Sequence, residues 1–439
     1  MRGFSKTVVL FGAGAALEWG GPTTSYLTAM TRKVGTLFTG LDGQTATELI
    51  YQTLLKSGHS AEDINFETLV NAIDELISHY AYFDGKRKTS SISRTLLHSN
   101  FGDDFWDFDI YGGEETHGYR LNIPKGTTYD YAEYSINNES PHQFYFQHLL
   151  SLMLININAR VSKYSYTKSA ETAHGDFTTI NSAFGDWYRQ MSNDSIVRMY
   201  TLNYDRNFKL IAAHLGYDIF EGFSEPSKVG SIYHDGRLEL DKILNREDIA
   251  VHYNLHGSSF WNVHPRDQRT QLNNMWVSLN PYISLSSISS SPVLQINRGQ
   301  SVQVSNIITG YHKTQKSFAT PFRQMQAAFD RDCMLGDRIV VIGYSFGDFH
   351  INSSIVNALK YNKKVKLEFV DPAYSEVDGR KGYDLLVDRL IHIFSDFFKN
   401  KRTRPIYSLD KMCCTYFEDR LKVSMMGFKQ YLTEQHWKI

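Results

Sequence analysis

The short segment TLNYDRNF places polar residues where a buried strand is expected to end. Asn203 and Asp205 follow the apolar, β-prone run SIVRMY, which predicts a strand over 195–202. Burying an amide or a carboxylate is costly unless something hydrogen-bonds it. In α/β proteins, ligands bind in the crevice at the carboxyl ends of the strands. We therefore expect these two side chains to face a ligand.

A glycine-rich turn follows the first expected strand, KTVVLF. Glycines in GAGAALEWGGP, residues 12–22, would let the backbone approach a pyrophosphate in front of a helix N-terminus. The common dinucleotide motif has a third glycine where this chain has Leu17, and no acidic residue ends a following second strand. As a dehydrogenase motif the segment is therefore weak, and a purely structural turn explains it equally well.

The run VHYNLHG alternates as a strand does, so His252, Asn254 and His256 are expected to share one face. A spacing of four between histidines suits a metal only on a helix, and a third ligand such as His264 would need a loop to fold back. An ordinary hydrogen-bonded histidine remains the alternative to a reactive one.

The fourth strand end is VVIGYSFGDFHIN, residues 340–352. Gly343 and the Ser345 hydroxyl suit close approach to a phosphate or a ribose. Asp348 is either a ligand-facing carboxylate or the N-cap of the following helix. The residues leave both readings open.

The elements that must position these residues alternate between strands and helices. Further strands are expected over 249–255, 337–345 and 364–371, with helices over 321–332 and 351–362, which predicts βαβ units around a parallel sheet. We expect an α/β, Rossmann-like core from 1–23 and 195–400, a large, mainly helical insertion from 24–194, and a C-terminal helical tail from 401–439. The insertion includes an amphipathic helix in NFETLVNAIDELI, a core helix over 144–157, and an irregular or lid-like stretch over 82–140.

The amino-acid composition indicates which kinds of binding partner and which compartment to expect. A formal net charge of −1 gives no overall attraction to nucleic acid or membrane, and no direct binding to either is expected. Three cysteines among 439 residues form no disulfide framework, which fits a reducing cytoplasm. The N-terminus resembles a signal peptide, but Gly12 and Gly14 interrupt its apolar run, so a strand and turn explain it better.

The four motifs occur in the order GAG, TLNYD, HG and GYS, and in this order the chain resembles the sirtuin family. The longer forms TLNYDRNF and GYSFGDFHIN, with INFETL over 64–69, resemble the sirtuin-like NAD-cleaving proteins of bacterial anti-phage defence. The resemblance implies a Rossmann-like domain that binds NAD+, with Asn203, Asp205 and His256 around the nicotinamide ribose. It also implies contacts to the rest of the dinucleotide from Gly12, Ala13, Gly14, Pro22, Gly343, Tyr344, Ser345, Asp348, His350 and Asp371.

Cleavage of the nicotinamide–ribose bond creates an oxocarbenium-like centre and a neutral leaving group, so it needs negative charge near the sugar, an oriented water and a base. Asn203 is expected to position water and ribose hydroxyls. Asp205 is expected to offset the developing charge. His256, titrating near neutrality, is expected to take the proton.

Two departures from the deacylase pattern favour hydrolysis by water. Residues 258–320 contain no cysteine, so we expect no zinc ribbon and no zinc. Ala16 and Thr23-Thr24 stand where the deacylases have Ser and Asp-Phe, and that Phe shields the intermediate. The expected activity is therefore an NAD+ hydrolase that depletes NAD+ in abortive infection. The alternatives are a zinc-free deacylase or ADP-ribosyltransferase, and a non-catalytic NAD or ADP-ribose sensor.

The resemblance also implies partners. We expect a homo-oligomer that is switched on by a partner protein such as a HerA-like ATPase, by a nucleotide, or by a phage-derived trigger.

Overall fold

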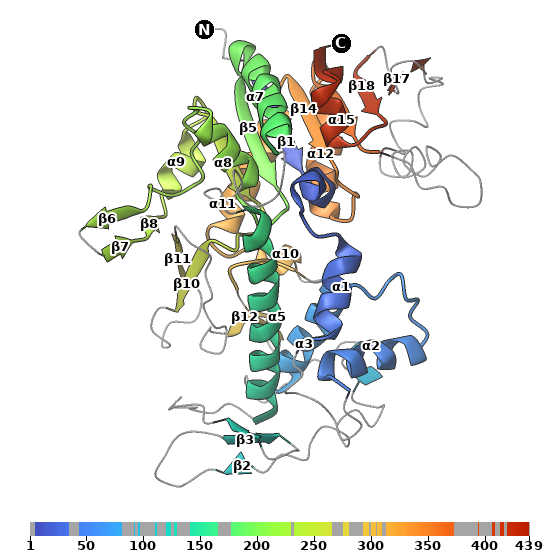
Figure 1. Cartoon of the computed structure of the whole chain (residues 1–439), viewed down its shortest axis with the longest axis vertical. Coiled ribbons are helices and arrows are strands. Elements are labelled where there is room, and N and C mark those ends of the chain that lie inside the picture. Colours follow the sequence, from blue (N-terminus) through green and yellow to red (C-terminus); the bar gives the residue numbers. More distant parts are fainter. Residues whose placement is uncertain are drawn as a thin grey trace.

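The computed structural model describes residues 5–34, 44–80, 92, 95–96, 110–111, 120–123, 127–129, 141–165, 177–229, 232–265, 275–280, 293–297, 300–303, 305–309, 313–372, 394, 406–408, 413–416 and 419–438. These residues form an elongated molecule with a sheet-containing lobe and a helical lobe (Figure 1). Most of the stretch over 82–140, expected as irregular structure or a lid, lies outside the described residues.

The core of the first lobe is a parallel sheet, which confirms the α/β, Rossmann-like prediction. Its order is β16-β17-β18-β15-β14-β1-β5-β9, and all neighbours from β18 to β9 pair in parallel, whereas β16 and β17 are antiparallel. The strands are β1 (Lys6–Phe11), β5 (Ile196–Thr201), β9 (Val251–Asn254), β14 (Arg338–Ile342), β15 (Lys366–Val370), β16 (Ile406–Ser408), β17 (Cys413–Tyr416) and β18 (Leu421–Ser424).

The register aligns the carboxyl ends of the central strands. Phe11 at the end of β1 pairs with Ile342 on one side and with Thr201 on the other, and Thr201 pairs with Asn254. The chain leaves β1 for β5 and β9 on one side, then returns to β14 and β15 on the other. This reversal between β1 and β14 is a topological switch point, the place where ligands bind in open α/β sheets.

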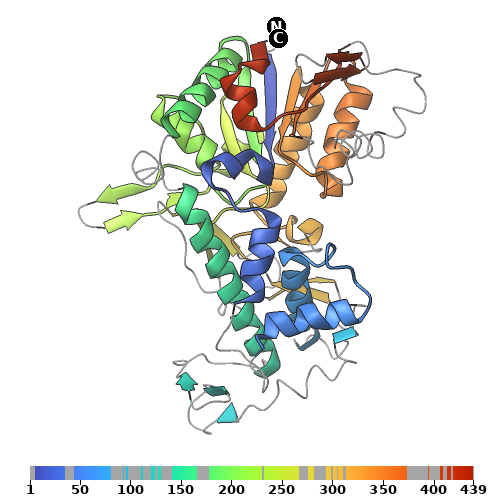
Figure 2. The same ribbon diagram turned by 45° about the vertical axis from the view of Figure 1, so that its right-hand side comes forward.

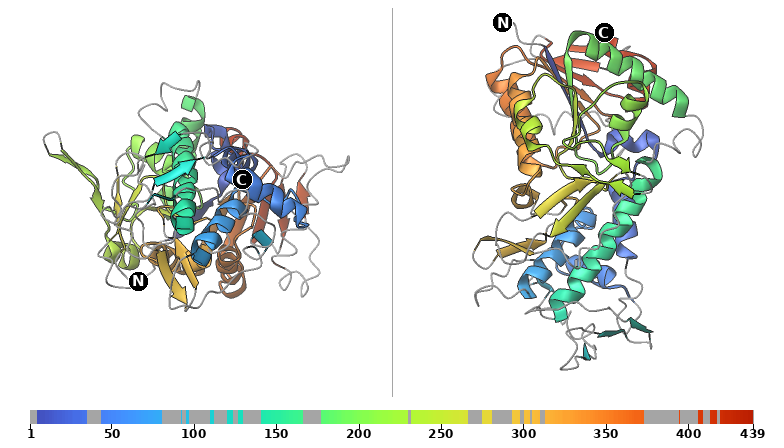
Figure 3. Two further views of the ribbon diagram at one scale, coloured as in Figure 1. Left: turned by 90° about the horizontal axis from the view of Figure 1, so that it is seen from below. Right: turned by 90° about the vertical axis from the view of Figure 1, so that its left-hand side faces the viewer.

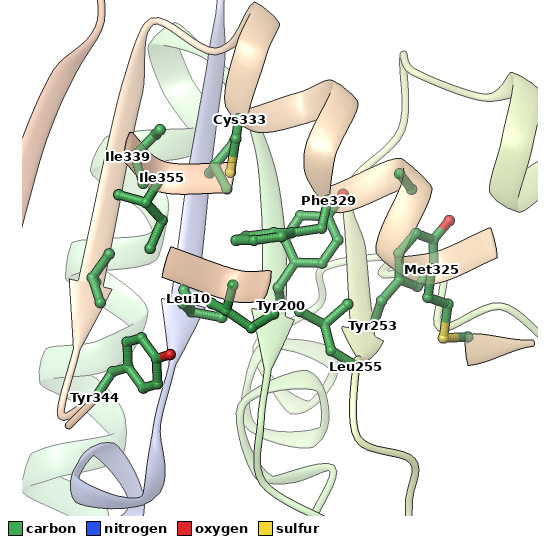
Figure 4. Close-up of a cluster of buried hydrophobic side chains, with 14 of the residues drawn as sticks. Leu10, Tyr200, Tyr253, Leu255, Met325, Phe329, Cys333, Ile339, Tyr344 and Ile355 are labelled. Carbon is green, nitrogen blue, oxygen red and sulfur yellow. The ribbon is translucent and has the colours of Figure 1, made fainter. Parts of the chain in front are cut away.

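Helices cover both faces of the sheet because strand residues alternate in direction. Val8 and Leu10 pack with α11 (Phe322–Leu335) and α12 (Phe349–Tyr361), as the close-up in Figure 4 shows for Leu10, Phe329 and Ile355. Val9 and Phe11 pack on the opposite face with α7 (Phe177–Asp194), α8 (Asn207–His214) and α15 (Phe428–Thr433).

The second lobe is built around its own apolar cluster. Its helices are α1 (Thr24–Arg32), α2 (Ala46–Lys56), α3 (Phe66–Tyr80) and α5 (Pro141–Ser165). Figure 2 shows them beneath the sheet, and the strand directions bring the carboxyl edge of the sheet toward this lobe. Later segments join it: α3 contacts β13 (Gln300–Gln303), which pairs with β12 (Val293–Asn297), and Ile307 lies in the cluster. The views in Figure 3 show the same arrangement from below and from the side.

The packing differs from the expected boundaries in two places. α7 was expected within the insertion, but its residues Phe184 and Trp187 pack against the sheet. The C-terminal helical tail is wrong in its first part, because 421–424 form strand β18 and the helix α15 begins only at Phe428. Leu421 and Val423 alternate toward the core beside β15, so pairing with an existing strand decides their conformation.

The remaining elements are short. They comprise the 3₁₀ helices η1 (Ala13–Trp19) and η3 (His436–Lys438), the helices α9 (Leu240–Asn245) and α10 (Lys313–Lys316), and the strands β2 (Ile110–Tyr111), β3 (Arg120–Ile123), β4 (Thr127–Tyr129), β6 (Ser227–Val229), β7 (Ile232–His234), β8 (Gly236–Arg237), β10 (Trp261–Pro265) and β11 (Met275–Leu279). Within the described ranges, every helix is too short or too polar to cross a membrane.

Candidate functional site

The loops after β1 and β14 meet backbone to backbone at the switch point. The N–H of Gly12 donates to Ile342 O at 2.9 Å, and the N–H of Gly14 donates to Gly343 O at 2.9 Å. A Cβ atom at Gly12 would lie 2.4 Å from Gly343 O, and one at Gly343, whose φ is 58°, would lie 2.3 Å from Ala15 N. Only glycine permits this approach. The N–H groups of Gly12 and Gly14 already donate hydrogen bonds to Ile342 and Gly343. The expectation that these glycines lie along a pyrophosphate stays a prediction.

Asn203 lies directly beside this junction. Its side-chain Nδ2 donates to Gly12 O at 3.0 Å, and its own N–H donates to the Thr201 hydroxyl. Asn254 supports the same turn from the next strand, because its Nδ2 donates to the carbonyl oxygens of Asn203 and Asp205. The amide of Asn203 is thereby held beside the junction of the two loops, with 8% of the residue exposed.

Asp205 is fully buried and its carboxylate is engaged on both oxygens. Oδ1 accepts the N–H of Asn207 at the start of α8, and Oδ2 accepts the hydroxyl of Tyr164 from α5, both at 2.8 Å. Burial raises the pKa of Asp205, and these hydrogen bonds only partly offset that effect. This geometry favours a part in holding the turn and the helical lobe over direct contact with a ribose.

His256 follows β9 by two residues, as Asn203 follows β5 by two, so the aligned register brings both to the same edge. Its residue is 4% exposed, and the buried Nε2 has no hydrogen-bond partner within the described ranges. Burial lowers the pKa of His256 to about 3. The expectation that it titrates near neutrality is therefore wrong: desolvation of the imidazolium keeps the ring neutral across physiological pH.

Asp348 stands at the N-cap position of α12, but its side chain makes no capping hydrogen bond. Instead, Oδ1 lies 3.0 Å from Lys313 Nζ and Oδ2 lies 3.9 Å from His256 Nε2. Burial acts to raise the pKa of Asp348, but His256 and Lys313 outweigh it and hold the pKa below its ordinary value. Of the two readings that the residues leave open, the cap is not formed, and contact with a ligand stays a prediction.

Lys313 completes a chain of charges, because its Nζ also lies 2.8 Å from Glu67 Oε1 of α3. Burial acts to lower the pKa of Lys313, yet the two carboxylates raise it above its ordinary value. Glu67 has a raised pKa, first because of its burial. Lys313 therefore stays charged between Glu67 and Asp348 and ties the helical lobe to the site.

The other predicted contact residues lie around this centre. Tyr344 is buried, and its hydroxyl bonds to the backbone of Asp348 and to Asn352, so it holds this loop, and its contact with the dinucleotide stays a prediction. Ser345 and Ala13 are exposed beside the switch point. The ring centroid of His350 lies 6.1 Å from that of His256. Pro22 is half-buried ahead of α1, and Asp371 is half-buried directly after β15.

His252 does not join the site, although it lies on β9, two residues before Asn254 and four before His256. It is fully buried, and burial lowers its pKa to about 4. Its nearest charges are those of Glu221, Arg206 and Lys209. Among the residues that the structure describes, no three His, Cys, Asp or Glu side chains are grouped to hold a metal. The expectation of no zinc stays a prediction.

Sequence reasoning missed three residues at this site: Lys313, Glu67 and Tyr164. Glu67 lies within INFETL, whose signal in the sequence is its family resemblance alone. Tyr164 and Lys313 carry no local signal, because each is defined by a partner far away in the sequence.

No family model matches this chain, and no curated protein matches it. Among solved structures, it is similar to a Sir2 homologue variant in complex with ADP-ribose, at 12% identity and a TM-score of 0.30, covering 90% of this chain and 94% of the other. A second such variant with ADP-ribose has 12% identity and a TM-score of 0.31, covering 89% and 93%. A Sir2 homolog–NAD complex has 12% identity and a TM-score of 0.27, covering 89% and 90%. Similarity this low transfers no function, so the assignment below rests on the motifs and the geometry.

Proposed function

We propose that this protein is an NAD+ glycohydrolase that yields nicotinamide and ADP-ribose. The observation that carries the proposal is that Asn203 and His256 both lie at the carboxyl edge of the sheet, where Asn203 bonds to Gly12 after β1 and His256 faces Asp348 after β14. Both residues lie two positions beyond the paired strand ends Thr201 and Asn254. An amide and a neutral imidazole at a switch point form a site for a dinucleotide whose glycosidic bond reacts.

The residues fit the chemistry of water attack on a ribose. The C1′–N bond breaks with its electron pair leaving on neutral nicotinamide, and water attacks C1′ of the oxocarbenium-like centre. Because Nδ2 of Asn203 is committed to Gly12, Oδ1 is the atom that accepts a hydrogen bond from the water or a ribose hydroxyl. The neutral Nε2 of His256 takes the proton released by the water. Asp205 in this proposal holds the turn that presents Asn203.

The wider role belongs to the same proposal and is supported by the motif resemblance. The protein would act in the cytoplasm in anti-phage defence, as a homo-oligomer that depletes NAD+. Activation by a HerA-like ATPase, a nucleotide or a phage-derived trigger agrees with the buried state of Asn203 and His256, since NAD+ must reach side chains that are 8% and 4% exposed.

The test is incubation of the purified full chain with NAD+, with nicotinamide and ADP-ribose quantified and NAD+ binding measured by calorimetry. Asn203→Ala and His256→Ala should each lower turnover by about 10²-fold or more while the variants still bind NAD+. The control Asn245→Ala changes an exposed amide on α9 and should match the wild type.

Equimolar products that disappear in Asn203→Ala would support the hydrolase. Transfer of ADP-ribose to an acceptor would favour the transferase, and NAD+ binding with no turnover, even after mixing with candidate triggers, would favour the sensor. Turnover that persists in Asn203→Ala would contradict the assigned site.

A further inference from the structure

The carboxylate that faces the imidazole of His256 comes from Asp348, directly before α12, rather than from the TLNYD segment. Asp205 has both oxygens engaged by Tyr164 and Asn207. Asp348 Oδ2 lies 3.9 Å from His256 Nε2, the atom that has no hydrogen-bond partner within the described ranges. If His256 accepts a proton, the resulting imidazolium is buried, and a carboxylate at this distance is what stabilises it.

The backbone of Asp348 is fixed independently of its side chain. Its N–H donates to the Tyr344 hydroxyl at 3.0 Å, and that hydroxyl lies 3.1 Å from Asp348 O and 2.9 Å from Asn352 Oδ1. The Asn352 amide in turn donates to Phe346 O. Because the carboxylate does not cap α12, these contacts leave it directed toward Lys313 and His256.

Lys313 determines whether Asp348 remains an anion. Its side chain is 14% exposed and lies between two carboxylates, 2.8 Å from Glu67 and 3.0 Å from Asp348. Two carboxylates that share a partly buried site favour protonation of one of them unless a cation lies between them. Without Lys313, Glu67 and Asp348 would therefore repel each other, and Asp348 would turn away or take up a proton.

We propose that Asp348 and Lys313 are positioning residues of this site: Lys313, anchored by Glu67 of the helical lobe, holds Asp348 charged and in place, and Asp348 supports proton transfer to His256. This inference rests on the proposed hydrolase activity and adds a regulatory contact to it. Glu67 lies on α3, whereas Asp348 and His256 belong to the sheet lobe, so a displacement of the helical lobe would break the Glu67–Lys313–Asp348 chain and change the charge beside the base.

Charge variants of the full chain test the inference, with kcat and KM for NAD+ hydrolysis measured separately. Asp348→Asn should lower kcat by about 10- to 100-fold, part of the usual contribution of a general base, while KM stays within about threefold. Lys313→Met should lower kcat similarly, and Lys313→Arg, which keeps the charge, should recover most of it. Lys360→Met, an exposed charge on α12, is the control and should stay within about twofold of the wild type.

The double variant Lys313→Met with Glu67→Gln gives the sharpest readout. Removing the second carboxylate relieves the repulsion, so the double variant should be at least about threefold faster than Lys313→Met alone. Additive losses would show that Lys313 only packs and would overturn the charge argument. Thermal unfolding of each variant identifies any that fails to fold, and Lys313→Arg then carries the comparison.

Different results would refute the hydrolase activity and the positioning role of Asp348 and Lys313. A wild type that releases no nicotinamide under any condition removes the hydrolase. A wild type that hydrolyses NAD+ while Asp348→Asn retains full kcat removes only the positioning role of Asp348 and Lys313.

Discussion

Replacing Gly12 by alanine tests whether the two glycine loops set the geometry of the site. The new Cβ would lie 2.4 Å from Gly343 O and 2.7 Å from Tyr344 Cα, both backbone atoms that cannot rotate away. One loop must therefore shift by roughly 1 Å. Overpacking of this kind costs about 1–3 kcal/mol, and a misplacement of about 1 Å at a reacting centre can cost about 10²-fold in rate.

The assay compares thermal unfolding, NAD+ binding and NAD+ hydrolysis of Gly12→Ala with those of Gly347→Ala. The control adds the same methyl group in the same neighbourhood, but its Cβ meets nothing closer than the Ser345 hydroxyl at 4.0 Å. We expect Gly12→Ala to lose about 10²-fold in kcat/KM and to unfold a few degrees lower, with Gly347→Ala close to wild type. A Gly12→Ala protein as active as the control would refute the inferred role of the contact.

Three further predictions concern buried charges. Asp332→Ala should destabilise the protein by about 3–5 kcal/mol in chemical unfolding, because it leaves Arg198, which is fully buried and lies 2.6 Å from that carboxylate, unpaired. Burial acts to raise the pKa of Glu221, but Arg206 and Lys209 hold it at about 2, against an ordinary 4.5. This contributes on the order of 3 kcal/mol that is present above about pH 4.5 and lost as the pH falls through about 2. The stability difference between wild type and Glu221→Gln should therefore shrink between pH 5 and 3. Since the pKa of His256 is about 3, the pH profile of kcat/KM should show no acidic limb from this residue between pH 5 and 8, and a limb near 6.5 that vanishes in His256→Gln would contradict its burial.

The central sheet could be predicted because its strands are apolar in sequence as well as buried in space. β1, β14 and β15 each read as a short apolar run that precedes a turn, and parallel strands buried on both faces require such runs. β18 could not be predicted in this way. The residues that follow β18 have a helical pattern, which extends in the sequence over β18 itself. The pairing with β15 that makes these four residues a strand is a contact with a distant part of the sequence.

In the candidate site too, features set by the local sequence could be predicted and those set by distant contacts could not. Asn203 and His256 could be placed together from sequence because both follow strand ends, and parallel strand ends meet at one edge. The neutral state of His256 could not be foreseen, because it depends on how much of the ring the surrounding loops cover. The place of Lys313 could not be foreseen either, since its two carboxylate partners come from opposite lobes and no local pattern joins them.

The position of β1 in the middle of the sheet has a consequence for synthesis. Strand β1, Lys6–Phe11, pairs with β5 and with β14, so its second neighbour is absent until residue 342 has been translated. The loop that Gly12 must contact follows one residue later. A nascent chain that extends just beyond Asn203 therefore has neither β14 nor Asp348. If the protein hydrolyses NAD+ as proposed, chains that end before β14 lack Asp348 and the loop that Gly12 contacts, and we expect them to be inactive.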